Sequence, residues 1–258
     1  MIADGFYKMD CFDGFKQIDD KSIDMILCDL PYGTTRNRWD SVLPLDLLWN
    51  EYERIIKDNG CIALFSAQPF TTDLINSNRK LFRYDLIWDK VLSSGFLNAN
   101  RMPLRRHEVI CIFYKNPPKY NPIIETRGKP REKGRKNDSI SDGNTCYGTY
   151  KALQNKNNQY FPTSILRFSN GNHNDGRIHS TQKNVDLLEY LILTYTDAGE
   201  LVLDNYAGSC STGIAAYKTG RRFIGFEKDS EIYEKASKRL EEYKSQITLF
   251  DLGMERKC

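Results

Sequence analysis

The sequence predicts an α/β fold built on a doubly wound, mostly parallel sheet. Short apolar runs alternate with longer amphipathic runs along the chain, as strands alternate with helices in such a fold. The apolar runs are nearly continuous, which is typical of parallel strands covered by helices on both faces. The alternation occurs on both sides of a polar middle stretch. We therefore expect one sheet whose sequence is interrupted by an insertion.

Each half of the chain supplies part of this sheet. The first half predicts strands at residues 23–28, 61–65, 86–88 and 109–114, and helices at residues 44–57 and 70–78. The second half predicts helices at residues 185–195, 211–219 and 230–244, and strands at residues 201–203 and 223–226. The expected organisation is a domain made of residues 1–115 and 168–258, with residues 116–167 inserted as a small basic region.

Composition excludes several classes of protein. The 258 residues are 40% hydrophobic and 12% aromatic, too apolar for a disordered or fibrous chain. No apolar stretch approaches the roughly 20 residues that cross a bilayer, and the acidic amino terminus is unlike a secretory signal. We expect a cytoplasmic protein with no membrane partner. The cysteines form no CxxC pair and the histidines no HxxxH pair, so no metal site is predicted.

Positive charge is concentrated in the inserted region. Residues 115–167 hold 11 Lys or Arg against 4 Asp or Glu, whereas the formal net charge of the whole chain is only +3. Such a block fits a solvated loop, but it can also neutralise a phosphate backbone and release counterions. Interleaved glycine and proline, followed by tyrosines, favour nucleic-acid binding. The candidate binding residues are Arg127, Lys129, Arg131, Lys133, Arg135 and Lys136.

The first motif with chemical content follows the strand predicted at residues 23–28. It consists of Asp29, Leu30, Pro31 and Tyr32, which place a carboxylate and an aromatic ring at the carboxyl edge of the sheet. The Asp29 carboxylate and the Leu30 carbonyl can accept both hydrogens of an exocyclic amino group, while Tyr32 stacks on the heterocycle. Taken alone, these four residues also fit a strand-terminating turn with a packing tyrosine.

The second motif follows the strand predicted at residues 201–203. Gly208 allows close approach of the backbone to a ligand, and the helix beginning nearby has free N–H groups that favour an anion. The hydroxyl residues Ser209, Ser211 and Thr212 are expected to cap that helix. The next strand ends in Glu227, which can accept hydrogen bonds from ribose hydroxyls. The residues that follow this strand lack the GxGxxG pattern of dinucleotide-binding turns, so a nicotinamide dinucleotide fits this turn less well.

Together with the run HSTQK at residues 179–183, these motifs resemble those of the S-adenosylmethionine-dependent DNA amino-methyltransferases. Their order along the chain is similar to that of the permuted β group. The resemblance implies a Rossmann-like methyltransferase fold, S-adenosyl-L-methionine as cofactor and double-stranded DNA as partner. It implies catalytic roles for Asp29, Leu30, Pro31 and Tyr32, and cofactor-binding roles for Asp10, Thr181, Lys183, Asn205, Tyr206, Gly208, Ser209, Ser211, Thr212 and Glu227.

The chain departs from the family pattern at four positions. Leu30 replaces a proline but keeps the backbone carbonyl, and Ser180 and Asn184 replace prolines of the HPTQKP motif. Cys210 replaces a glycine. If this position requires positive φ, a cysteine there costs of order 1 kcal/mol. In that case either the turn differs or the cofactor binds more weakly.

The resemblance implies DNA adenine-N6 methylation after base flipping, because position 29 is Asp rather than the Ser common among cytosine-N4 enzymes. Cytosine-N4 methylation is the alternative. Methylation of RNA or of a protein glutamine fits the same acceptor geometry but explains the basic insertion less well. A DNA-binding regulator with a vestigial cofactor pocket is suggested only by Cys210. A homodimer and a cognate restriction nuclease agree with the resemblance, but neither they nor a recognition sequence follow from the residues.

Overall fold

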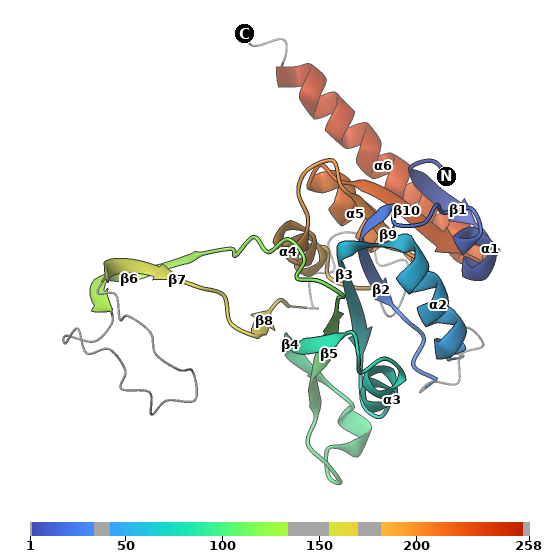
Figure 1. Ribbon diagram of the computed structural model, residues 1–258. Coiled ribbons are helices and arrows are strands. Elements are labelled where there is room, and N and C mark those ends of the chain that lie inside the picture. Colours follow the sequence, from blue (N-terminus) through green and yellow to red (C-terminus); the bar gives the residue numbers. More distant parts are fainter. Residues whose placement is uncertain (1, 34–41, 134–154, 170–181, 255–258) are drawn as a thin grey trace. The chain divides into compact units, whose positions relative to one another are not determined.

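The computed structural model describes residues 2–33, 42–133, 155–169 and 182–254, and it has the predicted α/β architecture (Figure 1). The chain divides into two compact units, one made of Met1–Asn121 and Ser164–Cys258 and the other of Pro122–Thr163. The second unit is shorter than the predicted insertion at both ends. Asn121 is tied to the first unit by side-chain hydrogen bonds to the carbonyls of Leu193 and Thr196.

In the described residues, eight strands of the larger unit form one sheet in the order β1-β10-β9-β2-β3-β5-β4-β8. Their bounds are β1 Gly5–Lys8, β2 Ile23–Asp29, β3 Ile56–Ser66, β4 Phe82–Ser94, β5 Arg105–Phe113, β8 Ile165–Arg167, β9 Leu201–Asp204 and β10 Arg222–Glu227. Every neighbouring pair is parallel except the two that β5 makes with β3 and β4. The expectation of a mostly parallel sheet is confirmed, and the short strands β1 and β8 were not predicted.

Helices cover both faces of this sheet (Figure 1). Their bounds are α1 Cys11–Phe15, α2 Leu45–Ile55, α3 Phe70–Ser77, α4 Val185–Tyr195, α5 Ser211–Lys218 and α6 Ser230–Met254, with a short 3₁₀ turn, η1, at Phe96–Asn98. Alternate residues of β2 separate the two cores. Met25 and Leu27 pack on the side of α4, α5 and α6, whereas Ile26 and Cys28 pack on the side of α1, α2 and α3. The sheet is therefore doubly wound, and Cys28 is a buried core residue, as predicted.

Although α6 spans 25 residues, none of the helices in the described parts of the chain has both the length and the apolar character required to span a membrane.

The smaller unit contains a two-stranded antiparallel sheet. Strand β6, Glu125–Lys133, pairs with β7, Asn155–Tyr160. No strand was predicted here, because the segment is polar on both faces and shows no alternation of apolar and polar residues. The Arg127 guanidinium lies 5.3 Å from the centre of the Tyr160 ring and forms an ion pair with Glu125. The basic block is thus strand in part rather than loop throughout.

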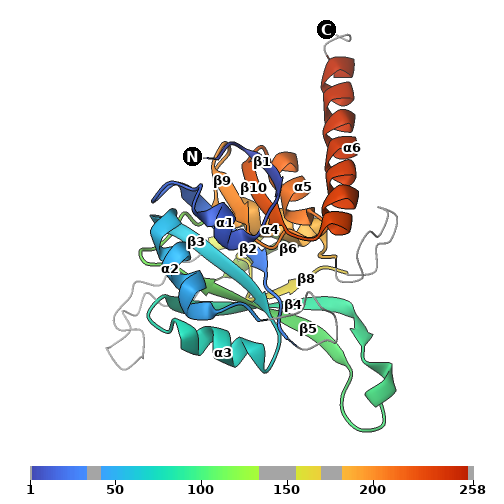
Figure 2. The same cartoon turned by 90° about the vertical axis from the view of Figure 1, so that its right-hand side faces the viewer.

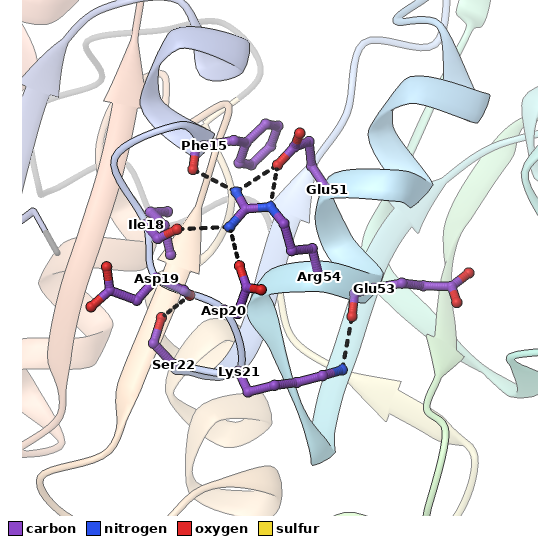
Figure 3. A network of polar contacts seen from close by, with 9 residues as sticks. All are labelled: Phe15, Ile18, Asp19, Asp20, Lys21, Ser22, Glu51, Glu53 and Arg54. Carbon is purple, nitrogen blue, oxygen red and sulfur yellow. Dashed lines mark hydrogen bonds and ion pairs between the residues drawn. The ribbon is translucent and has the colours of Figure 1, made fainter.

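Arg54 joins the amino-terminal segment to α2 (Figure 3). One guanidinium nitrogen donates to the Ile18 carbonyl at 2.9 Å and to Asp20 at 2.7 Å. The other terminal nitrogen donates to the Phe15 carbonyl at 2.7 Å and to Glu51 at 2.6 Å. Because Phe15 ends α1, this clamp fixes the end of α1 against α2.

The Arg54 clamp predicts a cost for a conservative change. Arg54→Lys should lower the free energy of unfolding by about 1–3 kcal/mol, because one ammonium cannot replace the planar set of guanidinium donors. Chemical denaturation measures the change. Arg79→Lys is the control, since Arg79 is exposed and its side chain donates only locally, to Asn76 in the last turn of α3. Equal stabilities of the two variants would contradict the clamp.

Candidate active site

The carboxyl ends of four neighbouring parallel strands meet at one edge of the sheet. In the register, Lys8 of β1 lies beside Glu227, Gly225 of β10 lies beside Asp204, and Leu203 of β9 lies beside Ile26. The residues that follow these strands therefore form a row: Asp10, Glu227, the turn at residues 205–210, and Asp29. Strand order reverses between β9 and β2, which is the position where doubly wound sheets bind ligands.

Asp29 ends β2 and has both carboxylate oxygens engaged. The Tyr32 hydroxyl donates to Oδ1 at 2.7 Å, and the Lys183 ammonium lies 2.7 Å from Oδ2. The side chain is 28% exposed, so it can still be reached from outside. The neighbouring Leu30 side chain is buried in the core on the side of α1, α2 and α3. This packing fixes the backbone that connects Asp29 to Tyr32.

Lys183 is shared between two carboxylates. Its Nζ lies 3.0 Å from Oε2 of Glu108, whose other oxygen forms an ion pair with Lys90. Lys183 and Glu108 are only 11% and 14% exposed. The resulting chain, Asp29, Lys183, Glu108 and Lys90, alternates in sign, and we call it the charge chain. Buried charges persist only when they are paired in this way.

Aromatic rings surround the Lys183 ammonium. Its Nζ lies 5.0 Å from the centre of the Phe65 ring and 5.9 Å from the rings of Tyr32 and Trp88. Such rings stabilise a cation through their electron-rich faces. The Tyr32 ring also stacks on Phe70, with centroids 5.4 Å apart. A base stacked on Tyr32 would therefore have to use its other face.

Burial and neighbouring charges set the ionisation of the charge chain. Burial raises the pKa of Asp29 above its usual value, and the Glu108 carboxylate adds to this, while the Lys183 ammonium opposes it. Burial also opposes ionisation of Glu108, but the ammonium groups of Lys183 and Lys90 outweigh it and hold the pKa of Glu108 below its usual value. Lys183 stays protonated because its two carboxylates outweigh its burial and raise its pKa. Lys183 is thus the cation that favours the ionised form of Asp29 against its burial.

The turn after β9 has the left-handed conformations that a glycine-rich loop would adopt. Gly208 has φ of 51° and Cys210 has φ of 58°. Residue 210 thus has the positive φ that a glycine would adopt easily. The cysteine at this position therefore carries the backbone strain considered in the sequence analysis. A Cβ at Gly213 would lie 2.6 Å from Cys210 Sγ, so the thiol fits only because residue 213 is glycine.

The hydroxyl residues of this turn do not cap α5 as predicted. The residue at the N-cap position is Cys210, which makes no side-chain capping hydrogen bond. The Thr212 hydroxyl instead donates to Asp204 at 2.6 Å, and the hydroxyls of Ser209 and Ser211 lie 3.2 Å apart. Burial raises the pKa of Asp204 to about 6. The reason for the error is that β9 ends in a buried carboxylate that competes for the nearest hydroxyl.

The two acidic residues predicted to face the cofactor already contact backbone groups. Glu227 accepts from the Gly208 N–H at 3.1 Å and from the Asp229 N–H at 2.7 Å, so it joins β10 to the turn after β9. Asp10 caps α1 by accepting from the Phe12 N–H and lies 3.2 Å from the Lys228 ammonium. Each of these carboxylates retains further lone pairs for a ligand.

The structure brings most of the predicted site residues to this one edge. Asn205 is buried and accepts from the Tyr52 hydroxyl of α2 at 2.5 Å, while Tyr206 N–H donates to Asp204. Lys183, expected near the cofactor, contacts Asp29. Thr181, Arg135 and Lys136 lie outside the described residues, as does the side chain of Lys133. Arg127, Lys129 and Arg131 lie on β6 of the smaller unit.

Sequence reasoning missed Glu108 and Lys90 as members of the site. Lys90 lies on β4 and Glu108 on β5, strands that continue past this edge, and Glu108 meets Lys183, which is far from it in sequence. The one signal was a carboxylate directly before the apolar run at residues 109–114. Among the described residues, no group of three His, Cys, Asp or Glu side chains could hold a metal ion.

Comparison with known proteins assigns the family. The family model described as DNA methylase, for N6 and N4 amino-methyltransferases, matches residues 23–238. The chain belongs to this family. It is 27% identical to the Type II methyltransferase M1.MboII of Moraxella bovis, over 90% of this chain and 94% of that protein. It is 27% identical to the DNA adenine methyltransferase YhdJ of Escherichia coli K12, over 88% of this chain and 79% of that protein.

Solved structures agree on the fold of this DNA methylase. The M1.HpyAVI complex with S-adenosylmethionine matches with a TM-score of 0.62 and 22% identity, covering 91% of this chain and 98% of that chain. The cytosine-N4-specific PvuII DNA methyltransferase matches with a TM-score of 0.65 and 15% identity, covering 93% and 86%. At these identities the likeness concerns the fold.

The methyl donor of this DNA methylase is S-adenosyl-L-methionine, and the residues present fit it. A Cβ added at Gly208 would meet no atom within 4 Å, so the turn after β9 faces open space. That turn leads into the amino end of α5, where N–H groups favour the carboxylate of an amino acid. Asp10 and Glu227 are the carboxylates that would accept hydrogen bonds from its adenosine hydroxyl and amino groups.

The charge chain predicts a change in pH dependence. The catalytic role expected of Asp29 requires its carboxylate form, so methyl transfer should decline as pH falls through its pKa. Lys183→Gln removes the cation that favours ionisation, and the acid limb of kcat should move to higher pH by about one unit or more. The measurement is a pH profile of methyl transfer to DNA.

Two further variants test this interpretation of Lys183. Lys90→Gln is the matched control, because Lys90 contacts Glu108 and not Asp29 and should move the limb much less. Lys183→Arg should restore most of the wild-type profile. An unchanged acid limb in Lys183→Gln would show that Lys183 does not control the ionisation of Asp29.

Proposed function

We propose that this chain methylates the exocyclic N6 of adenine in double-stranded DNA by direct displacement, after the base is flipped out of the duplex. The observation that carries the proposal is the Asp29 carboxylate at the switch point of the sheet, held by Tyr32 and Lys183 and followed by Leu30. Asp29 and the Leu30 carbonyl accept the two amino hydrogens. The turn at residues 205–210, with Asp10 and Glu227, holds the cofactor at the neighbouring strand ends.

Methyl transfer requires that the amino nitrogen of the base become a better nucleophile and that it approach the methyl carbon along a fixed direction. The amino lone pair is delocalised into the base, and hydrogen bonds to Asp29 and Leu30 strengthen as positive charge develops on the nitrogen. Bound S-adenosylmethionine supplies an electrophilic methyl carbon and a neutral thioether leaving group. Asp29 is suited to receive the proton that the methylated nitrogen releases, because burial raises its pKa. Tyr32 orients the base by stacking.

We propose adenine rather than cytosine as the target base because residue 29 is an aspartate. The relation to the adenine methyltransferase YhdJ over most of both chains supports this choice. Cytosine-N4 methylation is the second candidate, and it is supported by the fold similarity to the cytosine-N4-specific PvuII enzyme. The Type II name of M1.MboII supports the further proposal that a restriction nuclease accompanies this chain.

The product of methyl transfer decides between the two bases. Purified protein incubated with labelled S-adenosylmethionine and unmethylated genomic DNA should yield N6-methyladenine in nucleoside mass spectrometry. Asp29→Asn should lower the rate by about a hundredfold or more, because it removes the charge that stabilises the developing cation. Asp73→Asn, at an exposed position on α3, is the control. N4-methylcytosine would overturn the choice of base, and full activity of Asp29→Asn would overturn the catalytic assignment.

The basic strand β6 is proposed to bind the phosphate backbone of the substrate. Reversing Lys129 and Arg131 to Glu should weaken DNA binding and reduce the slope of log affinity against log salt by about 2, since each lost phosphate contact removes about 0.9. Reversing Lys235 and Lys238 on α6 gives the same change in net charge and serves as the control. Titration of fluorescent duplex DNA at several salt concentrations measures both. Identical slopes for the two variants would refute the assignment.

A further inference from the structure

A buried hydrogen bond ties the turn after β9 to helix α2. Tyr52 of α2 is fully buried, and its hydroxyl donates to Oδ1 of Asn205 at 2.5 Å. Asn205 is the first residue after β9 and is only 1% exposed. The two residues are 153 positions apart in the sequence. This bond therefore joins a helix of the first half of the chain to the turn at residues 205–210.

Successive residues anchor this turn on the two faces of the sheet. Asp204, the last residue of β9, accepts from Thr212 of α5, which lies on one face. Asn205 accepts from Tyr52 of α2, and α2 lies beside α1 on the other face (Figure 2). The Asp204 bond is local, because Thr212 is only 8 residues further along the chain. The Asn205 bond, in contrast, fixes where the turn lies relative to a distant helix.

Helix α2 also contacts α1, the helix that Asp10 caps. The Phe15 ring of α1 packs edge-on against the Tyr52 ring, with centroids 5.9 Å apart. Burial raises the pKa of the Cys11 thiol to about 11, while the Asn205 side chain acts in the opposite direction, so the amide lies beside α1 as well. Helix α2 thus reaches both sides of the candidate cofactor site, the Asp10 side through α1 and the turn through Asn205.

Stability of the core does not account for the pair of Tyr52 and Asn205. Among the described residues, Nδ2 of Asn205 is buried and has no hydrogen-bond partner, and the Cys11 sulfur beside it is only a weak acceptor. A buried amide with one unpaired end is unfavourable, and apolar side chains of similar shape are often as stable or more so. What such a buried bond provides is a single geometry, because it is lost when the turn shifts.

We propose that Tyr52 is a positioning residue for S-adenosyl-L-methionine: through Asn205, its hydroxyl holds the turn at residues 205–210 in the place where it receives the cofactor. Tyr52 is buried and acts only through Asn205. Without the hydroxyl, the turn is held less firmly before the cofactor binds, and ordering it then reduces the affinity. This proposal rests on the proposed function, which places the cofactor at this turn.

Tyr52→Phe tests the proposal because it removes one oxygen atom and keeps the ring. The probe is S-adenosylhomocysteine, the demethylated cofactor, which binds without reacting, and calorimetry measures its dissociation constant. Tyr52→Phe should raise this constant about tenfold, since the buried amide loses its partner. In methyl transfer, the KM for S-adenosylmethionine should rise by a similar factor while kcat changes less than about threefold, because the lost contact serves binding.

Ser77→Ala is the matched control. The Ser77 hydroxyl accepts from the indole N–H of Trp49 at 2.7 Å, so this variant also costs α2 one hydrogen bond, but Ser77 lies on α3 and not at the turn. Its dissociation constant should equal that of the wild type. Asn205→Leu should weaken binding as Tyr52→Phe does, and the double variant should bind no more weakly than either, because the two residues act as one unit. Circular dichroism establishes that each variant is folded at the assay temperature.

An unchanged dissociation constant in Tyr52→Phe would overturn the proposal. Equal losses in Tyr52→Phe and Ser77→Ala would also overturn it, because the effect would then be one of general stability. Multiplied losses in the double variant would show that Tyr52 does not act through Asn205, with the same consequence.

Gly208→Ala separates this proposal from the proposed function, because it puts a side chain at positive φ into the open space of the turn. Weaker binding by Gly208→Ala together with unchanged binding by Tyr52→Phe would refute the role of Tyr52 and leave the cofactor at the turn. Unchanged binding by Gly208→Ala would refute the placement of the cofactor in the proposed function, and the role of Tyr52 with it.

Discussion

The parallel register of β1, β10, β9 and β2 is the constraint on which the site depends. These strands come from opposite ends of the chain, yet parallel pairing sends all their carboxyl ends to one edge. Asp10, Glu227, the turn at residues 205–210 and Asp29 are each ordinary strand-end residues in isolation. Their proximity makes a place where a cofactor and an amino group can meet. The reversal of strand order between β9 and β2 leaves room there for the ligand.

Charged side chains are partly buried at this edge of the sheet. The free-energy cost of their burial is reduced because two carboxylates share one cation. Lys183 contacts Asp29 and Glu108, and Glu108 in turn contacts Lys90. Removing Lys183 would take the paired cation from the partly buried Asp29, which is expensive in a medium of low polarity. The charge chain thus joins Asp29 to Lys90 and Glu108 at the base of the β4–β5 hairpin.

The turn after β9 shows how a departure from a family pattern is accommodated. Cys210 adopts the positive φ that glycine would adopt, and its buried thiol occupies space that the absence of a side chain at Gly213 provides. The turn is further held by Glu227 at Gly208 and by Arg239 of α6, which donates to the Ser209 carbonyl. Several independent contacts over-determine this backbone, so a single strained residue does not change its path.

The sequence by itself determined the α/β class, the principal strands and helices, and the two motifs, because apolar periodicity and strand-end residues are local signals. Helix α4 was predicted with both its ends, and Asp29 was predicted to follow a buried strand, at whose end the structure has it. Only the tertiary structure decided the strands β1, β8, β6 and β7, which are short or polar and exist through their pairing partners. It also decided that Lys183 contacts Asp29, that Glu108 belongs to the site, and that Thr212 bonds Asp204 instead of capping α5. Each of these depends on contacts between segments far apart in sequence, and no local pattern encodes such a distance.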